Sequence, residues 1–164
     1  MSEKTLEERI RVLEDINEIK LLRNSYSYSS NVDGEDMIRQ FADNFVADGE
    51  FNPGFGVLAG PEAIYEGLQP VSAIFACMMH ITTNGSVFVD GDTATGKWTG
   101  LFPHVMAGDT KLQWGNCYYY DEYVRTPDGW KFKSVNAKSF FFSQSWCDIF
   151  TTFLDNNRNC LVAR

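Results

Sequence analysis

The hydrophobic pattern of the chain changes near residue 80, and this change restricts the fold more than any other feature. After that point apolar and polar residues alternate, with the period of two that is typical of β-strands. Hairpin-type turns at Asp90-Gly91-Asp92 and Pro127-Asp128-Gly129 divide this half of the chain. The pattern predicts four strands, at about 79–89, 92–106, 111–125 and 129–142. We expect these strands to form a long antiparallel meander.

The beginning of the chain has helical periodicity instead. Thr5 and Glu8 have the spacing of a capping box, which predicts a helix from residue 5 to about 24. Apolar residues recur along this helix at gaps of three and four, in one stripe: Leu6, Ile10, Leu13, Ile16, Ile19 and Leu22. The polar stretch at 24–34 that follows could be a solvated helix end or could face a pocket.

Shorter elements connect this helix to the meander. We expect a short helix at 35–41 and a strand at 45–51. A further helix should start at Gly60-Pro61-Glu62, because proline favours the first helical position. That helix is predicted to run to about residue 79 with a break near Pro70, since proline interrupts the helical hydrogen bonds.

The order of the elements, helices first and then a meander, predicts an α+β fold. A curved antiparallel sheet wrapped around N-terminal helices makes a cone-shaped α+β barrel with an internal cavity. At 164 residues the chain is long enough for one hydrophobic core. We therefore expect a single domain over 1–164. Its core should lie at 5–142, and the tail at 143–164 should cover the pocket or pack on a neighbouring subunit.

The composition narrows the classes of function. Aromatic residues are 15% of the chain, a surplus that favours an aromatic-lined cavity or a subunit interface, although a bulky core would also account for it. The net charge of −8 argues against nucleic acid or an anionic membrane as partner. We find no signal-peptide pattern and no transmembrane stretch. Four widely spaced cysteines and only two histidines predict a cytoplasmic protein without a metal site.

His80 is the first candidate for chemistry, because it lies where the helical pattern gives way to the alternating one. Histidine is the side chain whose ordinary pKa allows it to take and return protons near neutral pH. A lone histidine on a strand is nevertheless more often a hydrogen-bonded core or rim residue than a base.

The chain resembles the SnoaL-like, nuclear-transport-factor-2-like superfamily over residues 9 to 142. The resemblance is carried by Tyr28-x-x-x-x-Asp33-Gly34, Gly60-Pro61-Glu62-Ala63-Ile64, Met78-Met79-His80, Asp92-Thr93-Ala94-Thr95-Gly96-Lys97-Trp98 and a segment from Gly115 to Phe132. The chain looks most similar to the branch that contains scytalone dehydratase, bile-acid 7α-dehydratase and hexachlorocyclohexane dehydrochlorinase. In those lyases the residues that match Asp33 and His80 are the catalytic dyad.

The resemblance implies roles for three residues. His80 would remove a proton from carbon, and Asp33 would orient the imidazole and stabilise its charged form. Tyr28 would polarise a carbonyl group or assist the leaving hydroxyl. Read without the resemblance, Asp33 is an ordinary turn residue and Tyr28 a rim aromatic.

The sequence also departs from its relatives. The bile-acid dehydratase pattern has an acidic residue shortly after the tryptophan that matches Trp98, and here Thr99-Gly100-Leu101-Phe102-Pro103-His104 contains none. His104 would share a face with Phe102 if the strand is regular, but Pro103 could break it. Asn136 and Lys138 would face inward with Phe132 unless a β-bulge reverses the register.

We therefore expect a cofactor-independent lyase that carries out a dehydratase-type β-elimination on a small, largely apolar cyclic or aromatic substrate. The alternatives are an isomerase or cyclase that uses the same base, and a non-catalytic small-molecule binding domain. The chain should form a homo-oligomer, with a trimer favoured over a dimer. The expected substrate-binding residues are Asn136, Trp98, His104, Tyr26, Phe102, Met78 and Lys138.

Overall fold

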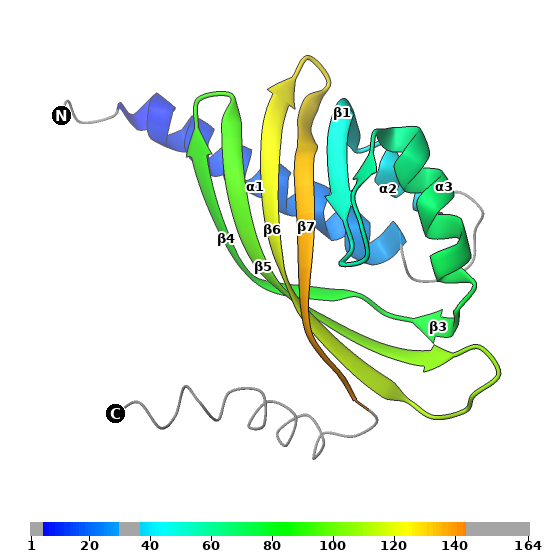
Figure 1. The fold of residues 1–164 in the computed structure, drawn as a ribbon. Coiled ribbons are helices and arrows are strands. Elements are labelled where there is room, and N and C mark those ends of the chain that lie inside the picture. Colours follow the sequence, from blue (N-terminus) through cyan, green and yellow to red (C-terminus); the bar gives the residue numbers. More distant parts are fainter. Residues whose placement is uncertain (1–4, 30–36, 144–164) are drawn as a thin grey trace, which may run out of the picture.

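The computed structural model of the chain describes residues 5–29 and 37–143, which form three helices and seven strands (Figure 1). The helices are α1 (Leu6–Ser29), α2 (Met37–Ala42) and α3 (Pro61–Ser72). The strands are β1 (Phe45–Asn52), β2 (Leu58–Ala59), β3 (Phe75–Met78), β4 (Ile81–Asp90), β5 (Thr93–Met106), β6 (Gln113–Thr126) and β7 (Gly129–Ser143). Of the tail predicted at 143–164, residues 144–164 lie outside the described residues.

The seven strands described form one strongly curled, mixed sheet in the order β2-β1-β7-β6-β5-β3, and β4 also pairs with β5. Strands β4 to β7 make the antiparallel meander that the alternating pattern predicted, and β1 adds to β7 in parallel. Figure 1 shows α1 running along the curled sheet, with α2 and α3 gathered beyond β1. The predicted cone-shaped α+β fold is confirmed, as a half-barrel with helices on its inner side.

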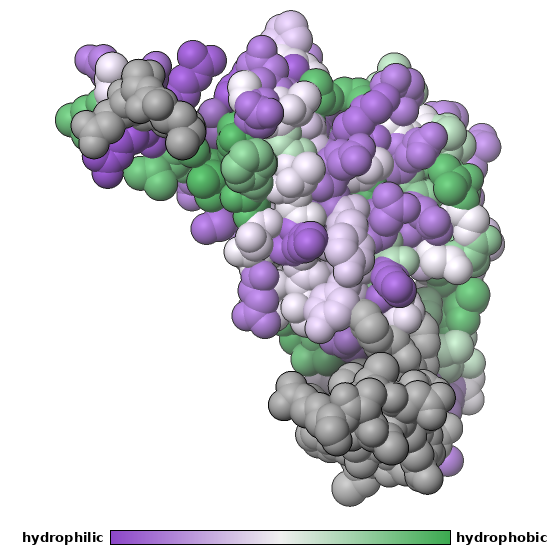
Figure 2. Space-filling view, turned by 60° about the vertical axis from the view of Figure 1, so that its left-hand side comes forward, coloured by the Kyte–Doolittle hydropathy of each residue, from purple (hydrophilic) through white to green (hydrophobic). Residues whose placement is uncertain are grey.

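Helix α1 begins as the capping box predicted. The Thr5 amide donates to a Glu8 carboxylate oxygen at 2.7 Å, and the Glu8 amide donates to the Thr5 hydroxyl at 3.2 Å. The helix continues to Ser29, five residues beyond the predicted end. Only its second half packs inside the sheet: Ile19, Arg23 and Tyr26 are buried, whereas the first part of the apolar stripe is exposed at Leu6, Ile10 and Leu13. Figure 2 shows apolar surface on the part of α1 that projects beyond the sheet.

The segment after α3 was predicted to be helical and is a strand instead. Helix α3 passes Pro70 but ends at Ser72, and Phe75 to Met78 form β3. This strand pairs with the far end of β5, where Met78 lies opposite His104. The uninterrupted apolar run of 74–79 has no helical or strand period of its own, so a partner that is distant in the sequence decides its conformation.

Pro103 does not break β5, because it lies where the strand exchanges partners. β5 pairs with β4 as far as Leu101 and with β3 from His104 onward. At the exchange, the Pro103 carbonyl accepts from the Met79 amide at 3.0 Å. In a strand the N–H and C=O of one residue point to the same side. The N–H that proline lacks would therefore point to the gap between β4 and β3, so no hydrogen bond of the sheet is lost. Phe102 and His104 therefore keep one face, as a regular strand requires, and both are buried.

A bulge at Lys133 changes which residues of β7 face inward. Phe132 is paired with Tyr123 and Ser134 with Glu122, so the register steps over Lys133. Val135 is consequently buried, and Asn136 and Lys138 are exposed on the outer face. The expectation of a regular strand with both side chains inward is corrected here.

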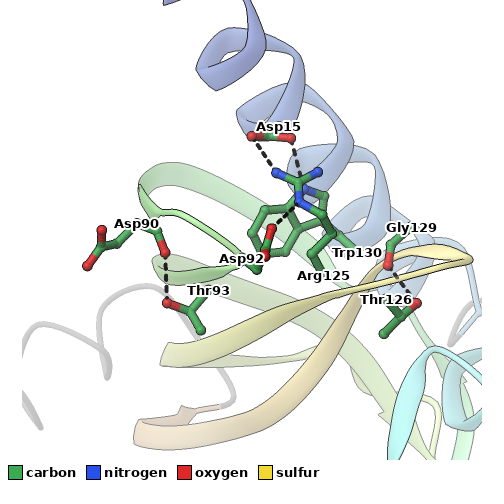
Figure 3. Close-up of polar contacts among 8 residues, drawn as sticks. All are labelled: Asp15, Asp90, Asp92, Thr93, Arg125, Thr126, Gly129 and Trp130. Carbon is green, nitrogen blue, oxygen red and sulfur yellow. Dashed lines mark hydrogen bonds and ion pairs between the residues drawn. The ribbon is translucent and has the colours of Figure 1, made fainter. Parts of the chain in front are cut away.

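A cluster of four residues, which we call the rim clamp, ties α1 to two hairpins (Figure 3). Arg125 donates to Asp15 at 2.7 Å and to Asp92 at 2.9 Å, and its guanidinium lies 4.5 Å above the Trp130 ring. Trp130 donates its indole N–H to the second Asp15 oxygen at 3.2 Å. The clamp therefore fixes the middle of α1 against the β4–β5 turn and the ends of β6 and β7.

Glycines on the inner face make room for three aromatic rings. A Cβ atom at Gly115 would overlap the Phe102 ring, which lies opposite on β5. A Cβ atom at Gly100 would likewise overlap the Tyr119 ring, and one at Gly85 would overlap the Trp98 ring. The rings therefore lie against bare backbone.

Within residues 5–29 and 37–143, no helix has the length and apolar character needed to cross a membrane.

Candidate active site

A cavity of about 830 Å³ lies inside the cone, a size typical of small-molecule sites. Residues of all three helices and of the inner sheet face line it, and most of them are apolar or aromatic. Aromatic rings make much of the wall: Tyr26, Phe41, Phe51, Phe55, Phe75, Phe102 and Tyr119. The surplus of aromatic residues therefore serves a cavity as well as a core.

His80 enters this cavity from the gap between β3 and β4. β3 ends at Met78 and β4 begins at Ile81, opposite the point where β5 exchanges partners. The centroid of the imidazole lies 5.8 Å from that of the Phe102 ring, and the two ring planes are tilted by 31°. The interruption in pairing thus turns the side chain of His80 toward the cavity.

Tyr26 of α1 meets His80 in the cavity wall. Its hydroxyl lies 3.3 Å from His80 Nε2, and the two rings meet edge to face at 4.9 Å. Burial, the Arg23 cation and His104 together lower the pKa of His80 to about 3. The imidazole is therefore neutral at neutral pH and can accept a proton, but with this pKa it is a weak base unless a nearby carboxylate stabilises the imidazolium.

Tyr119 and Cys117 of β6 continue the polar end of the cavity. The Tyr119 ring packs edge to face on Tyr26 at 5.7 Å, and both Tyr119 and Cys117 line the cavity. Burial raises the pKa of both tyrosines and of the Cys117 thiol. These groups therefore stay protonated and can donate hydrogen bonds to a ligand.

A buried charge pair lies behind this polar end, and we call it the interior pair. The side chains of Arg23 and Asp121 are both 0% exposed, and Arg23 Nε lies 3.5 Å from an Asp121 oxygen. The guanidinium carbon is 3.9 Å from the Tyr119 ring centroid and 4.7 Å from that of Tyr26. Asp121 accepts from the Tyr123 hydroxyl at 2.7 Å, and Tyr123 accepts from the Trp98 indole at 3.1 Å.

The predicted substrate-binding residues divide into three groups. Tyr26, Met78 and Phe102 line the cavity. Trp98 and His104 are buried in the wall behind it, where the Trp98 indole bonds Tyr123 and His104 Nδ1 lies 3.0 Å from the Phe102 carbonyl. Asn136 and Lys138 are on the outer face because of the bulge at Lys133.

For two of the three predicted catalytic residues the structure describes no side chain. Asp33 falls in the segment 30–36, and of Tyr28 only the backbone, near the end of α1, is described. The Asp33–His80 dyad therefore stays a prediction. His80 itself faces the cavity.

Sequence reasoning missed Arg23, Tyr119 and Asp121. A signal existed for Arg23, because Ile16, Ile19, Arg23 and Tyr26 continue one helical stripe at gaps of three and four. Tyr119 and Asp121 alternate with Tyr118 and Tyr120 on β6, so aromatic side chains occur on both faces of the strand. The sequence alone therefore does not show which face is the inner one.

In the part of the chain that the structure describes, no three His, Cys, Asp or Glu side chains gather as a metal site would require.

Comparisons with known proteins agree with this architecture. A family model described as a SnoaL-like domain matches residues 11–136. An uncharacterised protein of Mycobacterium tuberculosis is 34% identical over 122 residues, which cover 69% of this chain and 79% of that protein. A structure from Novosphingobium aromaticivorans, provisionally named a scytalone dehydratase, has a TM-score of 0.71 at 21% identity and covers 81% of this chain and 89% of its own.

A second structural neighbour is the type 3 hexachlorocyclohexane dehydrochlorinase of Novosphingobium barchaimii. Its TM-score is 0.70 at 20% identity, over 84% of this chain and 92% of that one. At this identity the likeness shows a shared fold, and any shared reaction has to be argued from the site.

Proposed function

Because the chain belongs to the SnoaL-like domain family, we propose that it is a cofactor-independent lyase of the dehydratase type. Its substrate would be a small, largely apolar cyclic or aromatic molecule that fits the aromatic cavity. The observation that carries the proposal is a neutral His80 at the polar end of that cavity, with the Tyr26 hydroxyl at its Nε2.

The reaction requires one proton acceptor and one leaving group. His80 takes the proton from a carbon atom that a neighbouring carbonyl group acidifies, and the C–H electron pair becomes the new double bond. The C–O bond on the adjacent carbon breaks, and the hydroxyl leaves as water with the proton that the His80 imidazolium gives back, so His80 returns to its neutral form. Asp33 orients His80 and stabilises the imidazolium, and Tyr28 assists the carbonyl or the hydroxyl. In this scheme Tyr26 is a further donor beside the base.

An isomerase is the second candidate, and the contact between Tyr26 and His80 favours it. A hydroxyl that bonds the base can return a proton to a different carbon of the same substrate, with no group leaving. Turnover in deuterated water separates the two reactions, because an isomerase leaves the mass unchanged apart from exchanged deuterium.

The test is a screen of hydroxylated polycyclic, phenolic and steroid-like compounds for loss of water, read by mass spectrometry. His80→Ala should abolish turnover and leave the fold intact. His104→Gln is the matched control, because His104 is the other histidine and does not line the cavity. Full activity in His80→Ala would refute the mechanism, and binding without turnover across the screen would favour a non-catalytic binding domain.

A homo-oligomer in the cytoplasm completes the proposal. The exposed apolar side chains Leu6, Ile10 and Leu13 of α1 support a subunit contact. Sedimentation equilibrium would distinguish the favoured trimer from a dimer, and a monomer at all concentrations would contradict this part of the proposal.

A further inference from the structure

The interior pair places the positive charge of Arg23 behind the wall at the polar end of the cavity. The Arg23 guanidinium does not line the cavity, but the rings of Tyr26 and Tyr119 separate it from the interior and both rings do line it. The cation is therefore one aromatic ring away from a ligand that contacts Tyr26 or Tyr119 in the cavity.

Asp121 compensates this cation only in part. The pair makes one approach at 3.5 Å through Arg23 Nε, and the same carboxylate oxygen also accepts from Tyr123. Among the described residues, none of the three guanidinium nitrogens has a hydrogen-bond acceptor. Burying a cation with so few acceptors costs stability, and the ring faces of the two tyrosines are its closest remaining electron-rich contacts.

A positive charge on the face of a phenol ring favours negative charge on the phenol oxygen. Arg23 accordingly opposes the effect of burial on the pKa of both Tyr26 and Tyr119. Burial keeps both hydroxyls protonated, and the cation makes each O–H a stronger donor. An oxygen atom that carries negative charge gains most from such donors.

We propose that Arg23 is a positioning residue that acts through Tyr26 and Tyr119, and that these two hydroxyls bind the acidic oxygen of a planar, apolar ligand. The ligand class is a cyclic or fused-ring molecule that carries a phenol, an enol or a conjugated carbonyl at one end. The ring system lies among the aromatic walls, and the oxygen meets the two hydroxyls beside His80. The Tyr26 O–H then turns from His80 Nε2, which lies 3.3 Å from it, to the ligand oxygen. The inference rests on the proposed function only in taking this cavity as the substrate site.

Equilibrium binding of a naphthol series tests the inference without any turnover. The probes are 2-naphthol, ring-substituted 2-naphthols of increasing acidity, and 2-methoxynaphthalene, whose oxygen cannot ionise. The affinity of the wild-type chain should rise with naphthol acidity, and 2-methoxynaphthalene should bind about tenfold more weakly than 2-naphthol. The absorption spectrum of the bound naphthol should shift toward that of the naphtholate.

Arg23→Met should remove the dependence on acidity and the spectral shift, and Arg23→Lys should restore part of both. Arg125→Met is the matched control, since Arg125 also stacks on an aromatic ring, at 4.5 Å from Trp130, but belongs to the rim clamp. This control should bind the whole series as the wild type does. An unchanged dependence on acidity in a folded Arg23→Met would overturn the role of Arg23.

Tyr119→Phe and Tyr26→Phe test the same inference if Arg23→Met does not fold. Each removes one donor and keeps the cation, and each should weaken the most acidic naphthol about tenfold while it changes 2-methoxynaphthalene little. Wild-type affinity in both variants would overturn the inference. Acidity-dependent binding with no turnover would support this inference and refute the proposed lyase activity. Turnover without acidity-dependent binding would support the lyase activity and refute this inference.

Discussion

Two arginine–aspartate pairs hold α1 inside the cone, and they are built differently. In the rim clamp, both Asp15 oxygens accept a hydrogen bond, and Arg125 divides its donors between two carboxylates. In the interior pair, a single contact of 3.5 Å joins two side chains that are 0% exposed. The clamp is 7% exposed at Asp15 and 23% at Arg125, so water can reach it.

The difference shows which pair serves stability and which serves the site. A bonded pair at the margin gains from charge-assisted hydrogen bonds and loses little hydration. A fully buried pair with unused donors is a poor stabiliser, because desolvation offsets its attraction. Such a pair remains useful where its charge acts on neighbouring groups, here the tyrosines that line the cavity.

Breaking the interior pair should have the largest effect. Asp121→Ala leaves the Arg23 cation buried and uncompensated, and we expect the free energy of unfolding to fall by about 3–5 kcal/mol. Urea unfolding measures this loss. The double variant Arg23→Met with Asp121→Leu should recover most of it, because a buried pair replaced by apolar side chains is often neutral. A double variant as unstable as Asp121→Ala would contradict the comparison.

Breaking the rim clamp should cost less and should leave the cavity unaffected. Asp15→Ala removes the bonds to Arg125 and Trp130, and we expect a loss of about 1.5–3 kcal/mol in the same urea experiment. Affinity for 2-naphthol should equal that of the wild type. A naphthol affinity that falls together with stability would show that the two pairs are not independent.

The rim clamp should lose its contribution to stability in acid. Hydrogen bonding to Arg125 holds the pKa of Asp15 below its usual value, so its contribution is present above the unfolded pKa and is lost as the pH falls through the folded one.

Acidification should therefore reduce the stability of the wild type relative to Asp15→Asn. The slope is at most about 1.4 kcal/mol per pH unit, the value for a difference of one proton. Urea unfolding of the two proteins between about pH 6 and about pH 3 measures this slope. A difference in stability that does not change with pH would refute the assignment.

The smallest effect should come from the outermost carboxylate of the clamp. Asp92 is 75% exposed and bonds Arg125 at 2.9 Å. Asp92→Asn should change the free energy of unfolding by less than about 1 kcal/mol, and added salt should remove the difference. A larger loss that persists in high salt would mean that this pair is not screened by water.

Local signals in the sequence predicted most of the fold. The capping box at Thr5 and the two hairpin turns depend on neighbouring residues alone, and each formed where it was expected. The strand at 75–78 and the bulge at Lys133 depend on partners elsewhere in the sheet, so no local pattern could reveal them.

The candidate site was less accessible to prediction for the same reason. His80 stood out because histidine is rare in this chain and lies at a change of pattern. Arg23 did not, since an arginine on a helix is usually solvated and its burial depends on Asp121, nearly one hundred residues away. Tyr26 was predicted only as a substrate-binding residue, and the longer course of α1 brought its hydroxyl to His80.

The bare backbone at Gly100 and Gly115 has a consequence for how this cavity can diverge between related proteins. Phe102 and Tyr119 rest where side chains at these two positions would otherwise lie. At Gly115, one nucleotide change to alanine would push the Phe102 ring inward and shorten the space for a ligand, whereas the same change at Gly100 would also move Tyr119 of the polar end. Descendants of one ancestor could in this way keep the chemistry and select for substrates of different length.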